Sequence, residues 1–172
     1  NASFIAHVSA LRETVGDDKT RAFIQGLKDN GAKRYDGNVQ ILDAVANGEV
    51  EVGLVNHYYL YNEFKERPGA PVANFYPGQK SGEGTFINVT GAGVIKGTKR
   101  QAQAEAFVRF LLGKQAQEYF RDEVSEYPLA TGVAALPDLP PLDQLKSIDV
   151  PLTRLGRDLD GTLQLLKDVG LT

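Results

Sequence analysis

The sequence predicts an α/β fold, because stretches with two different hydrophobic periods are mixed along its whole length. In several stretches the apolar residues recur every three or four positions, which is the period of an amphipathic helix. Between them lie short apolar or alternating runs bounded by glycine, proline or asparagine, which is typical of β-strands. With 172 residues, 42% of them hydrophobic, the chain can bury a substantial core in one domain or slightly more.

The helical stretches are bounded by recognisable capping residues. Either Asn1 or Ser3 could cap the first helix, and Asn38 could cap the third. Gly113 interrupts the longest stretch, and leucines at helical spacing predict an amphipathic terminal helix. The predicted helices are residues 1–15, 18–28, 38–46, a charged stretch ending before residue 68, 104–120 and 152–166.

Other segments have the composition of strands and connections. Residues 50–55, 72–76 and 86–95 are predicted strands, the last of them as a strand, a turn at Gly91 and a second strand. The stretch 128–151 carries repeated prolines, which remove backbone donors and interrupt regular elements. We therefore expect 128–151 to be an irregular surface connection.

Composition excludes several classes of function. The formal net charge of -3 comes from 19 basic and 22 acidic residues without a basic run, which argues against nucleic acid as a partner. The absence of cysteine excludes disulfides, thiolate metal sites and a cysteine nucleophile. No apolar stretch reaches the roughly 20 residues of a membrane helix. Because the chain starts at Asn1 and contains no methionine, we expect it to begin inside a longer precursor with a signal or lipid anchor.

Motifs for other chemistries are weak. Gly91-Ala-Gly93 lacks the third glycine of a dinucleotide fingerprint and precedes strand-like residues. His7 and His57 lie fifty residues apart without an acidic partner in sequence, which favours structural or surface roles over a zinc site. Neither Ser3 nor Ser9 stands in the context of a hydrolase nucleophile.

A pair of adjacent tyrosines, Tyr58 and Tyr59, follows the predicted strand 50–55. Open α/β sheets bind ligands beyond the carboxyl ends of their strands, so this position places two phenols and the Asn56 amide where a cleft is expected. The alternative is that both tyrosines are amphipathic packing residues with their hydroxyls at the surface. The dipeptide alone leaves both interpretations open.

An anion site beside the tyrosines would suit a hard trivalent cation. A helix start at Asn1-Ala2-Ser3 offers unpaired N–H groups, and Asn38 and Asn56 add side-chain donors that could converge on one small oxyanion. Phenolate is a hard oxygen donor, and ferric iron can displace a phenolic proton although the free pKa is near about 10. His57 departs from a pure oxygen site but could point away.

At this point the chain resembles a known family, the periplasmic ferric-ion-binding proteins, which are the substrate-binding components of bacterial iron ABC transporters. The resemblance covers essentially the whole sequence, and several segments carry it together. These segments are Asn1-Ala-Ser-Phe4, Ala44-Val-Ala-Asn-Gly-Glu-Val50, Gly53-Leu-Val-Asn-His-Tyr-Tyr-Leu-Tyr61, Asn88-Val-Thr-Gly-Ala-Gly-Val94, Ala106-Phe-Val-Arg-Phe-Leu-Leu112 and Glu126-Tyr-Pro-Leu129.

The resemblance implies a set of site residues. Tyr58 and Tyr59 match the paired ferric ligands, and Asn56 and Asn38 match amides that hold a synergistic anion, phosphate or carbonate. Residues 1–3 match the anion-binding helix start, although the family pattern there is Ser-Gly-Ala and this chain has Asn1, Ala2 and Ser3. The implied metal is therefore Fe³⁺ with an anion whose identity stays open.

The resemblance also implies a two-lobed protein with the type II periplasmic-binding-protein fold, each lobe a mixed sheet flanked by helices, of which this chain is the carboxyl-terminal portion. Residues 1–88 would form most of the second lobe, 89–139 would return to the first, and 140–172 would come back to the second. The returning segment would expose Phe107, Phe110, Leu111 and Phe120 unless a missing amino-terminal lobe or a second, domain-swapped copy covers them.

The implied function is capture of ferric iron in an interlobe cleft and delivery to an ABC permease in the membrane. No chemical step is implied, so the chain is not expected to be an enzyme; use of Tyr58 as a general acid or base would need a neighbour that lowers its pKa. The alternatives are a related binding protein for a polyamine, thiamine or phosphonate, and an interaction module without a ligand. The implied location is the periplasm, or the cell surface as a lipoprotein in a Gram-positive organism.

Overall fold

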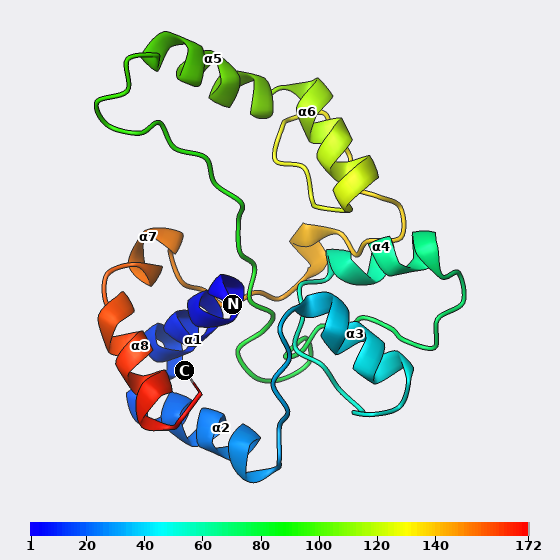
Figure 1. Ribbon diagram of the computed structural model, residues 1–172, viewed down its shortest axis with the longest axis vertical. Coiled ribbons are helices and arrows are strands. Elements are labelled where there is room, and N and C mark those ends of the chain that lie inside the picture. Colours follow the sequence, from blue (N-terminus) through cyan, green and yellow to red (C-terminus); the bar gives the residue numbers. More distant parts are fainter. Residues whose placement is uncertain (172) are drawn as a thin grey trace. The chain divides into compact units, whose positions relative to one another are not determined.

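The computed structural model describes residues 1–171, and in this part of the chain the regular elements are helices (Figure 1). The only β pairing among these residues is an isolated parallel bridge between Thr85 and Ser147. The α-helices are α1 (Ala2–Val15), α2 (Asp17–Asp29), α3 (Asn38–Ala46), α4 (Tyr58–Glu66), α5 (Gln101–Leu111), α6 (Lys114–Tyr119), α7 (Leu152–Leu155) and α8 (Leu159–Asp168), with a π-helical turn η1 (Phe120–Val124) and a 3-10 turn η2 (Leu142–Gln144).

The chain divides into two compact units, and each is made of segments that are far apart in sequence. Unit 1 contains Asn1–Gln40, Phe75–Asn88 and the chain from Leu145 onward, and unit 2 contains Ile41–Asn74 and Val89–Gln144. The first division falls inside α3. The lobe assignment implied by the resemblance refers to a complete two-lobed protein and stays a prediction.

The core of unit 1 is formed by α1, α2 and α8, which pack together around α1 (Figure 1). Each helix carries apolar residues at helical spacing, and burial of such a stripe against its neighbours is what stabilises a short helix. The fully or nearly fully buried residues of this core are Val8, Ile24, Leu165, Leu166 and Val169, with Phe4, Ile5, Leu27 and Leu171 packed against them.

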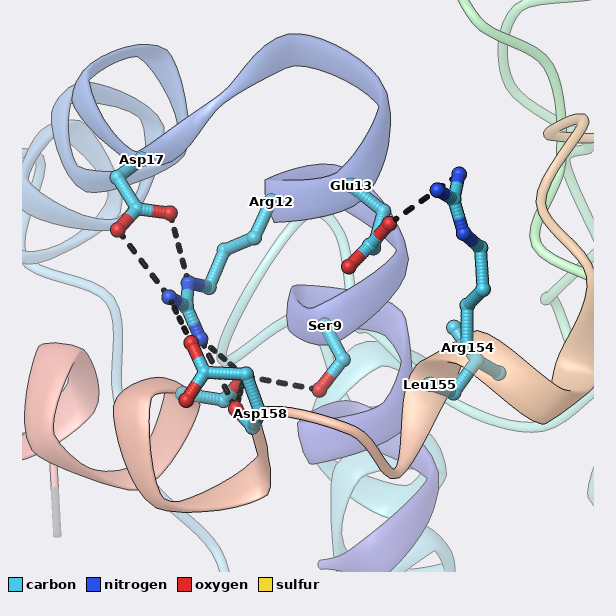
Figure 2. Close-up of a pocket in the computed structure, with 8 residues that line it drawn as sticks. Ser9, Arg12, Glu13, Asp17, Arg154, Leu155 and Asp158 are labelled. Carbon is cyan, nitrogen blue, oxygen red and sulfur yellow. Dashed lines mark hydrogen bonds and ion pairs between the residues drawn. The ribbon is translucent and has the colours of Figure 1, made fainter.

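A cluster of charged side chains joins the same three helices at one end (Figure 2). The Arg12 guanidinium on α1 donates to both carboxylate oxygens of Asp17, at 2.8 and 3.1 Å. It also donates to the Asp158 carboxylate at 2.7 Å, to the Asp158 carbonyl at 3.1 Å and to the Thr162 hydroxyl at 2.9 Å. These bonds occupy all five N–H donors of an arginine, so Arg12 is a cross-link between α1, the start of α2 and the start of α8.

The cluster also explains the local sequence around α8. The Asp158 side chain caps α8 by accepting from the Gly161 N–H at 3.1 Å, and a Cβ at Gly161 would lie 2.3 Å from the Asp158 carboxylate. Ser9 and Thr162 share a buried hydroxyl hydrogen bond of 2.9 Å beneath it. The pocket beside this cluster has a volume of only about 60 Å³, and its charged groups are already paired with one another.

Unit 2 holds α4, α5, α6 and η1 together with most of α3. Leu42 and Ala44 on α3, Leu60 on α4 and Ala116 on α6 are its buried apolar residues on helices. Arg67, which ends α4, pairs with Glu63 of that helix and with Asp43 of α3. By contrast α5 buries none of its residues, and Phe107 and Phe110 are 59% and 51% exposed.

The helices agree with the sequence prediction, with two interruptions. The stretch expected at 104–120 is divided between α5 and α6 at Gly113, as predicted, and continues into the π-helical turn η1. The terminal stretch expected as one helix over 152–166 is divided into α7 and α8. The reason is Asp158, which leaves the helical conformation to cap α8, because a capping residue has non-helical backbone angles.

The predicted mixed sheet is not shown in residues 1–171. The segments 50–55, 72–76 and 86–95 are non-helical, as expected for strands, but they form no ladder; the isolated bridge lies at Thr85, just before the third segment. A strand is stabilised by hydrogen bonds to a neighbouring strand, and hydrophobic pattern alone does not supply that neighbour. The proline-rich stretch 128–151 is irregular, as predicted, except for η2.

Among the described residues no helix combines the length and the apolar character that a membrane span requires.

The Arg12 cluster predicts an acid-dependent loss of stability. Hydrogen bonds from Arg12 lower the pKa of both Asp17 and Asp158, so their contribution is complete above the usual aspartate pKa of about 4 and is lost as pH falls through their lower values in the folded state. Asp158→Asn keeps a capping acceptor but removes the charge. We expect this variant to have a lower urea midpoint than the unsubstituted chain at pH 7, and the difference to shrink at about pH 3.

The control is Asp36→Asn, which changes an exposed aspartate of the same unit. It should follow the unsubstituted chain at both pH values. An equal deficit of Asp158→Asn at both pH values would show that the charge of Asp158 does not contribute through Arg12.

Candidate metal centre

The tyrosine pair forms the first two residues of α4, directly after the non-helical segment 50–55. Consecutive helical residues usually point in different directions, yet the rings of Tyr58 and Tyr59 lie with their centroids 4.7 Å apart and their planes inclined by 32°. Both side chains are half-buried. The two phenols are therefore neighbours in space as well as in sequence.

Asn56 lies beside the pair and contacts one of the two phenol oxygens. Its side-chain amide donates to the Tyr58 oxygen at 3.0 Å. An amide donor favours the negatively charged form of the group that accepts from it. The bond therefore connects Asn56 directly to the atom that a metal would bind.

The surroundings of Tyr58 favour the protonated form of its phenol. Burial raises the pKa of Tyr58 above its usual value, and the charges of Tyr59 and Glu126 and a hydrogen bond with Tyr59 raise it further. The hydrogen bond from Asn56 acts in the opposite direction and lowers this pKa. A phenol is already neutral at pH 7 at its ordinary pKa of about 10, and the net rise makes its deprotonation harder, so a metal that binds it must displace a proton.

The Nε2 atom of His57 points toward the protein backbone. This nitrogen lies 3.1 Å from the Ser125 carbonyl oxygen. The ring also contacts Tyr127, with centroids 5.1 Å apart, and Tyr61 at 6.4 Å. Burial lowers the pKa of His57, although the hydrogen bond to Ser125 partly opposes this effect. The imidazole is therefore packed among aromatic rings with its Nε2 atom at a backbone carbonyl, and whether it faces away from a metal stays a prediction.

The start of α4 is fixed by contacts from α3 and from the segment that follows α4. A Cβ at Gly53 would lie 2.3 Å from Ile41 and 3.3 Å from Val45 on α3, so the chain before the tyrosines runs against that helix. The His57 carbonyl accepts from the Asn74 side chain at 2.9 Å. These contacts define where the first turn of α4 begins.

The predicted anion-binding residues belong to two different units. Asn1, Ala2, Ser3 and Asn38 lie in unit 1, whereas Asn56 lies in unit 2 with the tyrosines. Asn1 caps α1 by accepting from the Ser3 N–H at 2.9 Å. Asn38 is the first residue of α3 and is buried. Convergence of these residues on one anion stays a prediction.

Some residues near the pair were not identified as site residues from sequence. Ser125 and Glu126 reach the tyrosine region from η1 and the segment after it, and Asn74 reaches it from residues that follow α4. Glu126 stands in one of the segments that carry the family resemblance, which is the only signal in sequence for it. In the part of the chain described here, no group of three or more histidine, cysteine, aspartate or glutamate side chains could hold a metal ion.

Solved structures similar to this chain belong to the class of periplasmic-binding-protein-like ferric binding proteins. Iron-bound HitA from Pseudomonas aeruginosa matches with a TM-score of 0.90 and 32% identity over 99% of this chain and 55% of that chain. Apo FutA2 from Synechocystis matches with a TM-score of 0.82 and 32% identity, covering 100% of this chain and 57% of that chain.

The chain belongs to the family described as bacterial extracellular solute-binding protein, whose model matches residues 1–150. The Fe(3+)-binding periplasmic protein of Serratia marcescens is 33% identical over 99% of this chain and 50% of its own length. Iron uptake protein A2 of Synechocystis is 36% identical over 90% of this chain and 47% of its own length. These relatives confirm the resemblance to ferric-ion-binding periplasmic proteins, and the chain spans about half of their length.

The packing of Gly53 predicts which glycine near the site cannot be enlarged. Gly53→Ala would force Ile41 to move, and overpacking of this kind usually costs about 1–3 kcal/mol. We expect the urea midpoint of the variant to fall. Gly91→Ala is the matched control in the same unit, because a Cβ at Gly91 meets nothing within 4 Å. Equal midpoints for the two variants would contradict the packing of the 50–55 segment against α3.

Proposed function

We propose that this chain contributes the tyrosine side of a ferric-iron site, in which the phenolate oxygens of Tyr58 and Tyr59 are iron ligands. The observation that carries the proposal is the pairing of the two rings, 4.7 Å apart at the start of α4, in a chain whose relatives are named as iron-binding proteins. Phenolate is a hard oxygen donor, which suits a hard trivalent cation.

Iron binding at this site is coupled to release of protons. A phenol of ordinary pKa, about 10, is already neutral at pH 7, and burial, first among several causes, raises the pKa of Tyr58 further. A metal binds the deprotonated form of its ligand, so the apparent affinity rises with pH. The Asn56 amide, 3.0 Å from the Tyr58 oxygen, stabilises the phenolate that forms.

A synergistic anion, phosphate or carbonate, would fill coordination positions that two phenolates leave open. We assign Asn56 on unit 2 and Asn1, Ala2, Ser3 and Asn38 on unit 1 as its donors. Since the Ser3 N–H already donates to the Asn1 side chain, an anion that uses this N–H must displace that side chain. A similar solved protein, from Trichodesmium, is described as being in complex with iron and citrate ligands, which supports the participation of an added oxygen ligand.

In the complete protein, the proposed role is capture of Fe³⁺ in an interlobe cleft in the periplasm and its delivery to an ABC permease. No chemical step is involved. The name of the Serratia relative, a periplasmic Fe(3+)-binding protein, supports the periplasm over the surface-lipoprotein alternative. The names of the Neisseria relatives, major ferric iron-binding proteins, support a binding role over an enzymatic one.

The part of the relatives that this chain does not span is the proposed partner of α5. This helix buries no residue, and Phe107, Phe110 and Leu112 are 59%, 51% and 62% exposed. Apolar patches larger than a few hundred Å² are rarely left uncovered on monomeric soluble proteins. A complementary amino-terminal half, or a domain-swapped second copy, would cover this helix.

A visible titration with ferric citrate tests the proposed ligands. We expect a tyrosinate-to-iron charge-transfer band that is weakened and shifted in Tyr58→Phe and in Tyr59→Phe and lost when both are substituted, because each substitution removes a ligand oxygen while keeping the ring. Tyr119→Phe is the control, since Tyr119 is exposed on α6 in the same unit and should leave the band unchanged.

Two outcomes would contradict the proposal. One is a band that is unchanged in both tyrosine variants. The other is the absence of a band in this chain and also after its complementary half is supplied, combined with binding of a polyamine, thiamine or phosphonate. That second outcome would favour the related solute-binding function, in which the paired rings stack on an organic solute.

The exposed face of α5 predicts self-association or dye binding by the isolated chain. Phe107→Ser combined with Phe110→Ser should reduce binding of a fluorescent apolar dye and shift the species seen in light scattering toward the monomer. The control is Phe23→Ser, which changes a 43% exposed phenylalanine of unit 1. A monodisperse monomer without dye binding before substitution would refute this prediction.

A further inference from the structure

We propose that His57 is a positioning residue for the tyrosine pair: its ring anchors the first turn of α4 to the Ser125 carbonyl and thereby fixes the orientation of the Tyr58 phenol. This inference rests on the proposed iron-binding function only for its consequence on the metal. The anchoring itself is a property of the protein without metal.

The hydrogen bond of His57 determines which ring nitrogen carries a proton. A carbonyl oxygen can only accept, so the Nε2 atom 3.1 Å from the Ser125 oxygen must be the donor. The neutral imidazole is therefore the Nε2–H tautomer. Because Nε2 is engaged in this bond, it is not available as an iron ligand.

The acceptor is held on a rigid piece of backbone. Ser125 is completely buried and adopts the left-handed conformation at φ 62°, which is uncommon for a residue other than glycine. Its N–H donates to the Arg121 carbonyl at 3.1 Å. Lys65 of α4 donates to the carbonyls of Asp122 and Glu123 in the preceding turn. The Ser125 carbonyl, which accepts the hydrogen bond from His57, therefore has little freedom to move.

The same ring is in contact with the tyrosine that it precedes. The centroids of His57 and Tyr58 lie 5.5 Å apart with the planes at 81°, an edge-to-face arrangement that is favourable for aromatic pairs. The Tyr127 ring lies 5.1 Å from His57, and the Tyr127 hydroxyl is fixed by a 2.6 Å hydrogen bond to the Pro140 carbonyl. The Tyr58 ring thus packs on the His57 side chain, which is held by the hydrogen bond of its Nε2 atom and by the contact of its ring with Tyr127.

The other histidine of the chain provides a matched comparison. His7 is also half-buried and has a ring contact, stacked on Phe86 with centroids 5.5 Å apart and planes at 4°. It lies on α1 in unit 1, away in sequence from the tyrosine pair. Substitutions at His7 therefore show how far altering a packed histidine changes the measured iron binding when the hydrogen bond between His57 and Ser125 is left intact.

The experiment separates the hydrogen bond from the ring. His57→Phe keeps an aromatic ring and removes the N–H donor, whereas His57→Gln replaces the ring but places an amide donor near the position of Nε2. Removing an outer-shell partner of a metal ligand typically costs about 10–100-fold in affinity. We expect His57→Phe to lose ferric affinity by this factor in citrate competition and to shift the charge-transfer band, and His57→Gln to recover most of both. His7→Phe and His7→Gln should match the unsubstituted chain.

Equal affinity and an unshifted band in His57→Phe would overturn the inference, and so would an equal loss in the Phe and Gln variants. A second measurement does not depend on iron. Nuclear Overhauser contacts between the ring protons of Tyr58 and Tyr59 in the metal-free protein should persist in His57→Gln and weaken in His57→Phe, and unchanged contacts would also overturn it. If neither the unsubstituted chain nor this chain supplied with its complementary half binds iron while these contacts behave as expected, the proposed function fails and the positioning role stands.

Discussion

The structure depends on contacts between segments that are distant in sequence and belong to the same unit. Because unit 1 takes three segments of the chain and unit 2 takes two, local helix formation cannot complete either of them. In unit 1 the bonds from Arg12 to Asp158 and Thr162 join the first segment to the last. In unit 2 the bond between His57 and Ser125 joins the two segments, together with the bonds from Lys65 to Asp122 and Glu123. Short helices are marginal alone in water, so these contacts determine whether the helices are held in a defined arrangement.

The tyrosine pair illustrates how such contacts create a site. Tyr58 and Tyr59 begin α4, and three contacts set where this helix begins. Gly53 packs against α3, the Asn74 side chain donates to the His57 carbonyl, and the Ser125 carbonyl accepts a hydrogen bond from the His57 ring. The resulting burial has a chemical effect as well, because it raises the pKa of Tyr58. A phenol is neutral at pH 7 without this burial, so the effect of the arrangement is to make deprotonation by the proposed metal more costly.

The sequence could predict features that depend on neighbouring residues. The helical period predicts α1, α2, α3, α5 and α6, whereas α4 is expected only as a charged stretch ending before residue 68. Asn1 is a possible cap of α1 from sequence, and the tyrosines follow the 50–55 segment. The mixed sheet, the Asp158 cap that divides the terminal helix, and the direction of the His57 ring could not be read in the same way. The sheet and the direction of the His57 ring depend on partners tens of residues away, about which hydrophobic periodicity contains no information. The Asp158 cap is local, because Asp158 accepts from Gly161, but the leucine spacing continues across it.

Counting donors indicates what a half-length chain can retain. Two phenolates supply two of about six positions around a hard trivalent ion, and the proposed anion donors are divided between two units. The affinity of the isolated chain should therefore be well below that of a complete protein, since each missing ligand leaves a position to water. The chain can retain the preorganisation of its two proposed ligand side chains. A phenol pair held by Asn56 and His57 loses less conformational entropy on binding than two free side chains would. Because this chain supplies only some of the proposed ligands, its iron complex is expected to be weak but dependent on the tyrosines.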